Sequence, residues 1–234
     1  EKPDYMKKLY LLATALLLSV LSFSQLRVAL VGGPPWASVK ETNSIPGWDS
    51  ATQPNYKSRT GINIGFIGEV PLGESGRWFF QPGFMFMSKG RKYAQVNDEA
   101  TATLNDTLIY NSSLVTNYID LPLNFSYKIP LGKQSSFLLS AGPYLGFFFK
   151  GKITDETRAF STNKFKKEET TLEVGKGPNK AKTFDFGVNA RAGFELGSVL
   201  ITGFISQGLT DFYTASYDGS FKHRVIGASV GFML

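Results

Sequence analysis

The feature that most constrains this chain is an alternation of apolar and polar side chains that returns in one long segment after another. Ile62, Ile64 and Phe66 share one face of an extended strand, whereas Asn63 and Glu69 share the other. This period of two residues is typical of β-strands with two chemically different faces. No segment after residue 25 shows a convincing helical period, so the sequence predicts an all-β fold.

The alternating segments are long and their apolar faces carry bulky Phe, Ile and Leu. A soluble sandwich also alternates, but strands of about 12–15 residues suit a tilted crossing of a lipid bilayer. An open edge in lipid would leave backbone groups unpaired, so the sheet must close. The prediction is an eight-stranded antiparallel transmembrane β-barrel. We expect its strands over 26–34, 58–71, 77–91, 114–129, 135–150, 182–196, 199–212 and 221–234.

The connections between these strands alternate in length. Short ones rich in Gly, Pro and small polar residues fall at 72–76, 130–134 and 197–198,. Long ones fall at 35–57, 92–113, 151–181 and 213–220. Membrane barrels of bacteria usually have short periplasmic turns and long outer loops. We therefore expect both termini in the periplasm and a single barrel domain over 25–234.

The first residues have the pattern of an export signal. Lys7 and Lys8 precede an apolar run over 9–23, and Ser22 and Ser24 are the small residues that signal peptidase requires,. The run falls short of the roughly 18–20 residues that a membrane-spanning helix needs, which disfavours the alternative of an anchor. Residues 1–24 are thus predicted to be a signal peptide, with 1–5 preceding the expected initiator Met6. The predicted location is the bacterial outer membrane.

Composition excludes several classes of function. The chain has no Cys, so it has no disulfide, thiol nucleophile or lipid-modified cysteine,. Its formal net charge of +6 is not gathered into a basic stripe with aromatic residues, so nucleic-acid binding is not expected,. The sequence shows no metal-ligand cluster, phosphate loop or nucleophile elbow. We expect neither a cofactor nor a metal.

Two short motifs resemble a known family. Tyr118-Ile119-Asp120-Leu121-Pro122-Leu123 resembles the strand motif of small outer-membrane barrels of Bacteroidetes, often labelled PorT-like or "porin family", and Gly208-Leu209-Thr210-Asp211-Phe212 resembles a segment of their penultimate strand. The resemblance implies an up-and-down meander of the OmpA/OmpX type. It implies little about activity, although one namesake is an accessory of protein secretion.

Charged residues on the polar faces form the main candidate site. Eight strands enclose little more than their own inward side chains, so balanced charges there should pair and plug the lumen. Glu69, Lys128 and Glu195 are expected in one layer, and Asp120 is expected to pair with Arg191, with Asp185 and Glu195 as rivals. The alternative is a narrow channel for small solutes. The predicted lumen charges are Arg59, Glu69, Lys89, Asp120, Lys128, Asp185, Arg191 and Glu195.

His223 is the single histidine and raises the alternative of an enzyme that modifies lipid A. Such enzymes use a His placed with a Ser and a carboxylate. Val225 stands where a His-x-Ser pair would need its serine. We therefore expect a histidine at the rim, exposed to water, and a non-enzymatic protein with a structural or interaction role.

The predicted ends of the barrel carry aromatic and charged groups. Trp78–Phe80, Phe147–Phe149 and Phe212-Tyr213 are expected to form interfacial girdles,. Segment 151–181 mixes Lys and Glu, which favours a solvated loop or contact with lipopolysaccharide phosphates or another membrane or secretion protein,. Asp49-Ser50-Ala51 and Asp106-Thr107-Leu108 are weak matches to a Bacteroidetes O-glycosylation pattern.

Overall fold

The computed structural model describes residues 26–44, 46–47, 52–97, 108–159, 164–175, 180–213 and 219–234. The predicted signal peptide and the Asp-Ser/Thr dipeptides at 49–50 and 106–107 lie outside these residues. The elements in chain order are β1 (Arg27–Gly33), β2 (Pro35–Asn43), η1 (Gln53–Asn55), β3 (Tyr56–Lys57), β4 (Arg59–Thr60), β5 (Asn63–Pro71), β6 (Trp78–Asn97), β7 (Leu108–Pro130), β8 (Ser135–Ala159), β9 (Phe165–Val174), β10 (Lys180–Ala181), β11 (Phe184–Leu196), β12 (Val199–Gly208) and β13 (Gly219–Met233).

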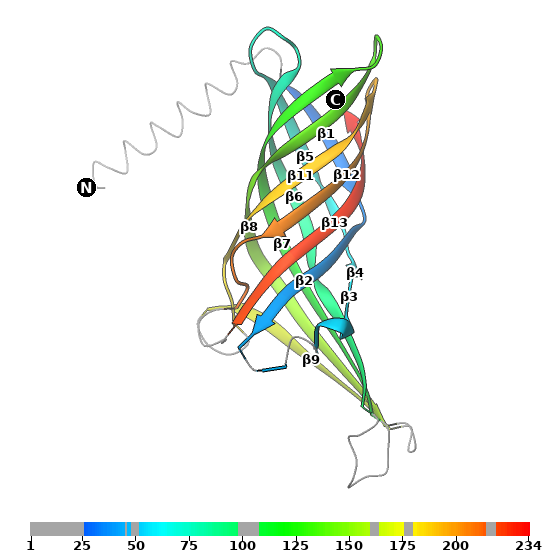
Figure 1. Ribbon diagram of the computed structural model, residues 1–234, viewed down its shortest axis with the longest axis vertical. Coiled ribbons are helices and arrows are strands. Elements are labelled where there is room, and N and C mark those ends of the chain that lie inside the picture. The colour runs from blue at the N-terminus through cyan, green and yellow to red at the C-terminus, as the bar shows by residue number, and fades with distance from the viewer. Residues whose placement is uncertain are drawn as a thin grey trace, which may run out of the picture.

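The long strands are tilted and wind around a common axis to form a cylinder (Figure 1). The ring has eight strands, because β1 and β2 are two parts of one strand around Pro34, and β3, β4 and β5 are parts of the next. Neighbours pair antiparallel in the order β1, β5, β6, β7, β8, β11, β12, β13. The last strand pairs with both β1 and β2, for example Gly32 with Val230 and Ala37 with Val225. The predicted closed, eight-stranded antiparallel barrel is confirmed.

Short turns join strands at one end of the cylinder, which we call the turn end. They are 72–77, 131–134 and 197–198. Gly197 has a φ of 62°, a left-handed conformation that glycine adopts without the steric cost of a Cβ,. Strand boundaries at this end agree closely with those predicted from the sequence.

At the opposite end the strands run further than predicted. β6, β7 and β8 continue past the ring, and β9 pairs with β8 from Gly151–Leu172 to Arg158–Phe165. Figure 1 shows this four-stranded sheet, which we call the extension, projecting from the cylinder. The expectation that 35–57 and 151–181 are loops is wrong, because β2 and β9 lie in them. The side chains of β9 are exposed apart from Leu172, and backbone pairing with β8 holds this strand in the sheet.

The wall of the cylinder separates two kinds of side chain. Along β11 and β13, exposed and buried residues alternate almost without interruption. Large apolar side chains on the outside form a belt that includes Ile64, Phe84, Phe125, Phe186, Ile205 and Val230. In the described part of the chain, no helix has the length and apolar character to cross a membrane.

The inside of the cylinder holds small apolar clusters between polar layers. Near the turn end, Val31, Met85, Leu138 and Met233 pack together. Near the extension, Tyr118, Phe148, Phe212 and Phe221 form a second cluster. The expected girdle position is therefore wrong for Phe148 and Phe212, which point inward. Phe148 has the same parity along β8 as the buried Leu138 and Tyr144, so three consecutive phenylalanines cannot all face outward,.

Candidate functional site

Four charged side chains close the lumen at the turn end. Lys128 Nζ lies 2.6 Å from Glu69 Oε1 and 2.5 Å from Glu195 Oε2. Arg27 reaches the same carboxylates, with Nη1 3.2 Å from Glu69 and Nη2 2.8 Å from Glu195. Gln81 Nε2 donates to the second oxygen of Glu69 at 3.2 Å. This turn-end cluster (Arg27, Glu69, Lys128 and Glu195) is formally neutral, so the buried charges compensate one another.

Arg27 was not among the residues expected in the lumen. The signal was present in the sequence, because Arg27 has the same parity as Ala29 and Val31, which are buried inside the barrel. A residue at the end of a strand is easily left out of a face assignment. Here it supplies the second cation of the turn-end cluster.

Lys89 organises a second cluster farther along the lumen and is fully buried. Its Nζ lies 3.0 Å from Asp120 and 2.8 Å from Asp185. Tyr144 donates to Asp185 at 2.9 Å, and Thr210 donates to the other oxygen of Asp185 at 3.0 Å. We call Lys89, Asp120, Asp185 and Tyr144 the Lys89 cluster. It holds two carboxylates against one ammonium group.

Arg191 lies between the two clusters without an ion pair, so the expectation that it pairs with Asp120 is wrong. Lys89 takes that place because its long chain reaches both aspartates. Nε and Nη1 of Arg191 are buried and have no hydrogen-bond partner within the described part of the chain. A cavity of about 30 Å³ separates Arg191 from Asp120 and Tyr144. The cavity has room for little more than a water molecule.

Arg59 and His223 differ from the expectation in opposite ways. Arg59 is half-buried and donates to Ser88 at 3.0 Å, and it makes no ion pair with any described residue. His223 was expected to be exposed at the rim, and this is wrong, since only 2% of it is exposed. Its Nε2 lies 3.4 Å from the Tyr118 hydroxyl, and the rings of Phe212 and Phe221 enclose it. No described Ser or carboxylate forms a catalytic hydrogen bond with it.

Basic side chains stand outside the wall just beyond the apolar belt. Lys40 is directly opposite Lys222, and Lys57 is directly opposite Lys92. Their neighbours in sequence point inward, so these four side chains face outward. None of the four forms an ion pair with a described residue. We call Lys40, Lys57, Lys92 and Lys222 the basic rim.

Direct opposition of like charges on adjacent strands is destabilising. The rim lies a few residues beyond Trp36 and Ile226, which are paired with each other and exposed on the belt. The geometry therefore places positive charge, without a described acidic partner, just beyond the end of the apolar belt. Periodicity alone did not reveal the rim, because β2 and β3 lie in a segment that was expected to be a loop.

The described residues hold no group of His, Cys, Asp or Glu that would bind a metal ion. They form a cylinder with an apolar exterior and an interior that contains buried polar and charged side chains. Backbone hydrogen bonds run around the whole ring and leave no free edge. These features define a membrane-spanning β-barrel.

The family follows from sequence comparison. Residues 22–214 match the model of the outer membrane protein beta-barrel domain, and the chain belongs to this family of the bacterial outer membrane. No curated protein matches the chain at a significant level.

Solved structures of several outer-membrane barrels are similar. Ail, the attachment invasion locus protein of Yersinia pestis, is 10% identical, with 89% of this chain and 98% of that chain covered and a TM-score of 0.34. Neisserial surface protein A is 8% identical, with coverage of 88% and 96% and a TM-score of 0.36. The outer membrane protease OmpT from Escherichia coli is 8% identical, with coverage of 91% and 98% and a TM-score of 0.31.

Proposed function

We propose that this protein is a non-enzymatic outer-membrane barrel with a plugged lumen, which acts at the cell surface by binding lipopolysaccharide and presenting its extension. In this orientation the turn end and both termini face the periplasm. The Tyr118–Leu123 motif supports a finer placement among PorT-like barrels of Bacteroidetes. Segments of the extension supply the surface for a membrane or secretion partner.

The observation that carries the proposal is the basic rim. Two pairs of lysines stand opposite each other where repulsion costs stability and no described carboxylate compensates it,. Phosphate groups of lipopolysaccharide would lie at this height and convert the repulsion into attraction. Each Lys near an anionic membrane surface contributes about 1 kcal/mol of attraction.

The test compares the change in stability caused by the same substitutions in two environments, where opposite signs are expected. In neutral detergent, Lys40→Gln together with Lys57→Gln removes both repulsions, so the free energy of unfolding should rise by roughly 0.2–1 kcal/mol for each pair. In bilayers that contain lipopolysaccharide the same variant should be less stable than the wild type, and it should retain several-fold less lipopolysaccharide on purification, measured by mass spectrometry.

The matched control is Lys133→Gln together with Lys164→Gln. Both residues are exposed, one in a turn at the turn end and one beside the tip of the extension. The control removes the same charge without touching an opposed pair, so the retained lipopolysaccharide should equal that of the wild type. If the rim variant changes stability in the same direction in detergent and in lipopolysaccharide bilayers, the proposal is wrong.

A further inference from the structure

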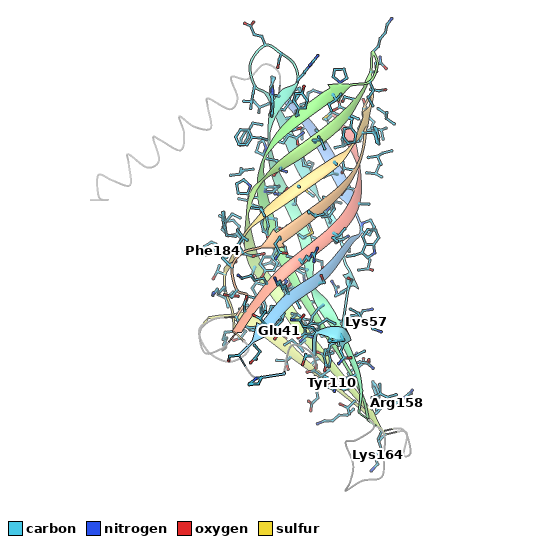
Figure 2. The ribbon with its side chains drawn as sticks, in the orientation of Figure 1. Glu41, Lys57, Tyr110, Arg158, Lys164 and Phe184 are labelled. Atoms are coloured by element: carbon cyan, nitrogen blue, oxygen red, sulfur yellow. The ribbon has the colours of Figure 1, made fainter. Side chains whose placement is uncertain are left out.

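A polar pocket opens where the extension leaves the ring, on the inner side of the wall whose outer side carries the basic rim. Its volume is about 440 Å³, which lies within the usual range for small-molecule sites,. Figure 2 shows Glu41 and Tyr110 at the root of the extension, with Arg158 toward its tip. The side chains that line this mouth pocket include Glu41, Tyr56, Arg91, Tyr93, Gln95 and Tyr110.

Arg91 is the cation of the mouth pocket. Its Cζ lies 4.8 Å from the centre of the Tyr56 ring and 5.9 Å from that of Tyr93. Nε and Nη1 are buried without a hydrogen-bond partner, and the guanidinium makes no ion pair with any described carboxylate. Arg91 as a whole is half-buried, and buried guanidinium nitrogens without an acceptor are unfavourable,. The planar fork of the group matches a carboxylate.

Three tyrosine rings stand in a row beside Arg91. The ring centres of Tyr56 and Tyr93 are 5.6 Å apart, and those of Tyr93 and Tyr110 are 6.0 Å apart. Their hydroxyls are held in place. Tyr56 donates to Glu41, Tyr93 donates to Gln95, and Tyr110 donates to Asp155 at 2.9 Å. The pocket is therefore built before any ligand arrives, which lowers the entropic cost of binding.

Acidic groups around the pocket limit the charge of a ligand. Burial, together with the hydrogen bond to Asp155, raises the pKa of Tyr110, so its hydroxyl stays protonated at neutral pH. Glu41 also lines the pocket and accepts a hydrogen bond from Tyr56. A polyanion such as a phosphate cluster would be repelled by Glu41 and Asp155. A ligand with a single carboxylate and many hydroxyl groups could pair with Arg91 and donate hydrogen bonds to Glu41.

We propose that the mouth pocket binds an acidic saccharide, with the carboxylate of a uronic-acid residue on Arg91 and the sugar ring against the tyrosines. The flat faces of the rings and the amide of Gln95 suit a polar ring with apolar faces. This site lies at the level of the basic rim, but its side chains point inward and the rim lysines point outward, so it does not depend on lipopolysaccharide phosphates.

The probe is D-glucuronate and its short oligomers, titrated into the full barrel in nanodiscs and followed by amide chemical shifts. Glucuronate should bind and glucose should bind at least about tenfold more weakly, because glucose lacks the carboxylate that Arg91 pairs with. Arg91→Gln should weaken glucuronate binding by about tenfold or more, the loss expected for charge-assisted hydrogen bonds.

Arg158→Gln is the matched control, because Arg158 is exposed on the same extension and carries the same charge. It should leave glucuronate affinity unchanged. Arg91→Lys, which keeps the charge without the planar fork, should lie between Arg91→Gln and the wild type. The proposal is overturned by equal binding of glucose and glucuronate, by equal losses in Arg91→Gln and Arg158→Gln, or by absence of glucuronate binding to a folded barrel.

Discussion

At the scale of single residues, Lys89 has the largest electrostatic role in the lumen. It is buried completely and is the partner of both Asp120 and Asp185. Removing one member of a buried ion pair costs far more than replacing the whole group, because the remaining charge is left in a poorly solvated site. Replacing Lys89 is therefore expected to destabilise the fold strongly, although its side chain lies inside the lumen and does not face lipid.

Lys89→Met should lower the free energy of unfolding by about 3–5 kcal/mol. Adding Asp120→Asn and Asp185→Asn should restore much of this loss, since no unpaired charge remains. Urea unfolding in lipid vesicles measures both effects. Lys133→Met, in an exposed turn, is the control and should change stability by less than about 0.5 kcal/mol. Equal stability of Lys89→Met and Lys133→Met would contradict the role of Lys89.

Arg191 gives the contrast within the same lumen. Arg191 makes no ion pair with a described residue, and two of its nitrogens have no described hydrogen-bond partner, so Arg191→Met should cost less stability than Lys89→Met,. An analysis of sequence alone would rank the two residues the other way, with Arg191 as the partner of Asp120. Alternation along β6 and β11 places both Lys89 and Arg191 in the lumen, and only the reach of each side chain decides which of them pairs with Asp120.

At the scale of elements, each strand of the ring presents one face to lipid. Phe186 on β11 and Phe165 on β9 are both exposed phenylalanines, at 46% and 57%. They differ in surroundings, because β11 belongs to the belt and β9 to the extension. Substitutions at these two positions therefore distinguish the cost of placing a charge in lipid from the cost of replacing any exposed phenylalanine.

Phe186→Arg should destabilise the barrel by about 2–4 kcal/mol if the site is near the midplane, and by less toward either surface. Phe165→Arg should be tolerated, because water surrounds the extension. Thermal unfolding in vesicles, read as the shift of the folded band in gel electrophoresis, compares them. Tolerance of Arg at both positions would show that the belt is not the lipid-facing surface.

The alternation of residues such as Ile62, Asn63 and Ile64 was sufficient to predict the barrel, its strand number and most facings. It could not predict β9, whose Lys and Glu side chains are solvated on both faces, so no alternation marks it. Alternation along β13 places His223 inward, but the predicted strand began at residue 221, so the imidazole was expected at the water-exposed rim. Contacts with Tyr118 and Phe212, which lie far away in the sequence, bury it.

At the scale of the whole molecule, the lumen is a packed interior. The cavity between Arg191, Asp120 and Tyr144 measures about 30 Å³, which is room for little more than a water molecule,. Planar-bilayer recordings of the full barrel should therefore show no steady conductance of porin size, with a known 16-stranded porin as the positive control. A stable, large open state would refute the plugged lumen and favour the narrow-channel alternative.

The pairing of the first strand with the last determines when the barrel can close during assembly. β1 meets β13 only after the final residues of the chain are available, and the same step brings Asn63 against Ser229 at 3.1 Å. Before this step, two strand edges are open and hydrogen bonds across the seam are missing. An incomplete chain thus lacks its seam altogether, so assembly should proceed to a finished ring or leave a species prone to capture by other strands and to degradation.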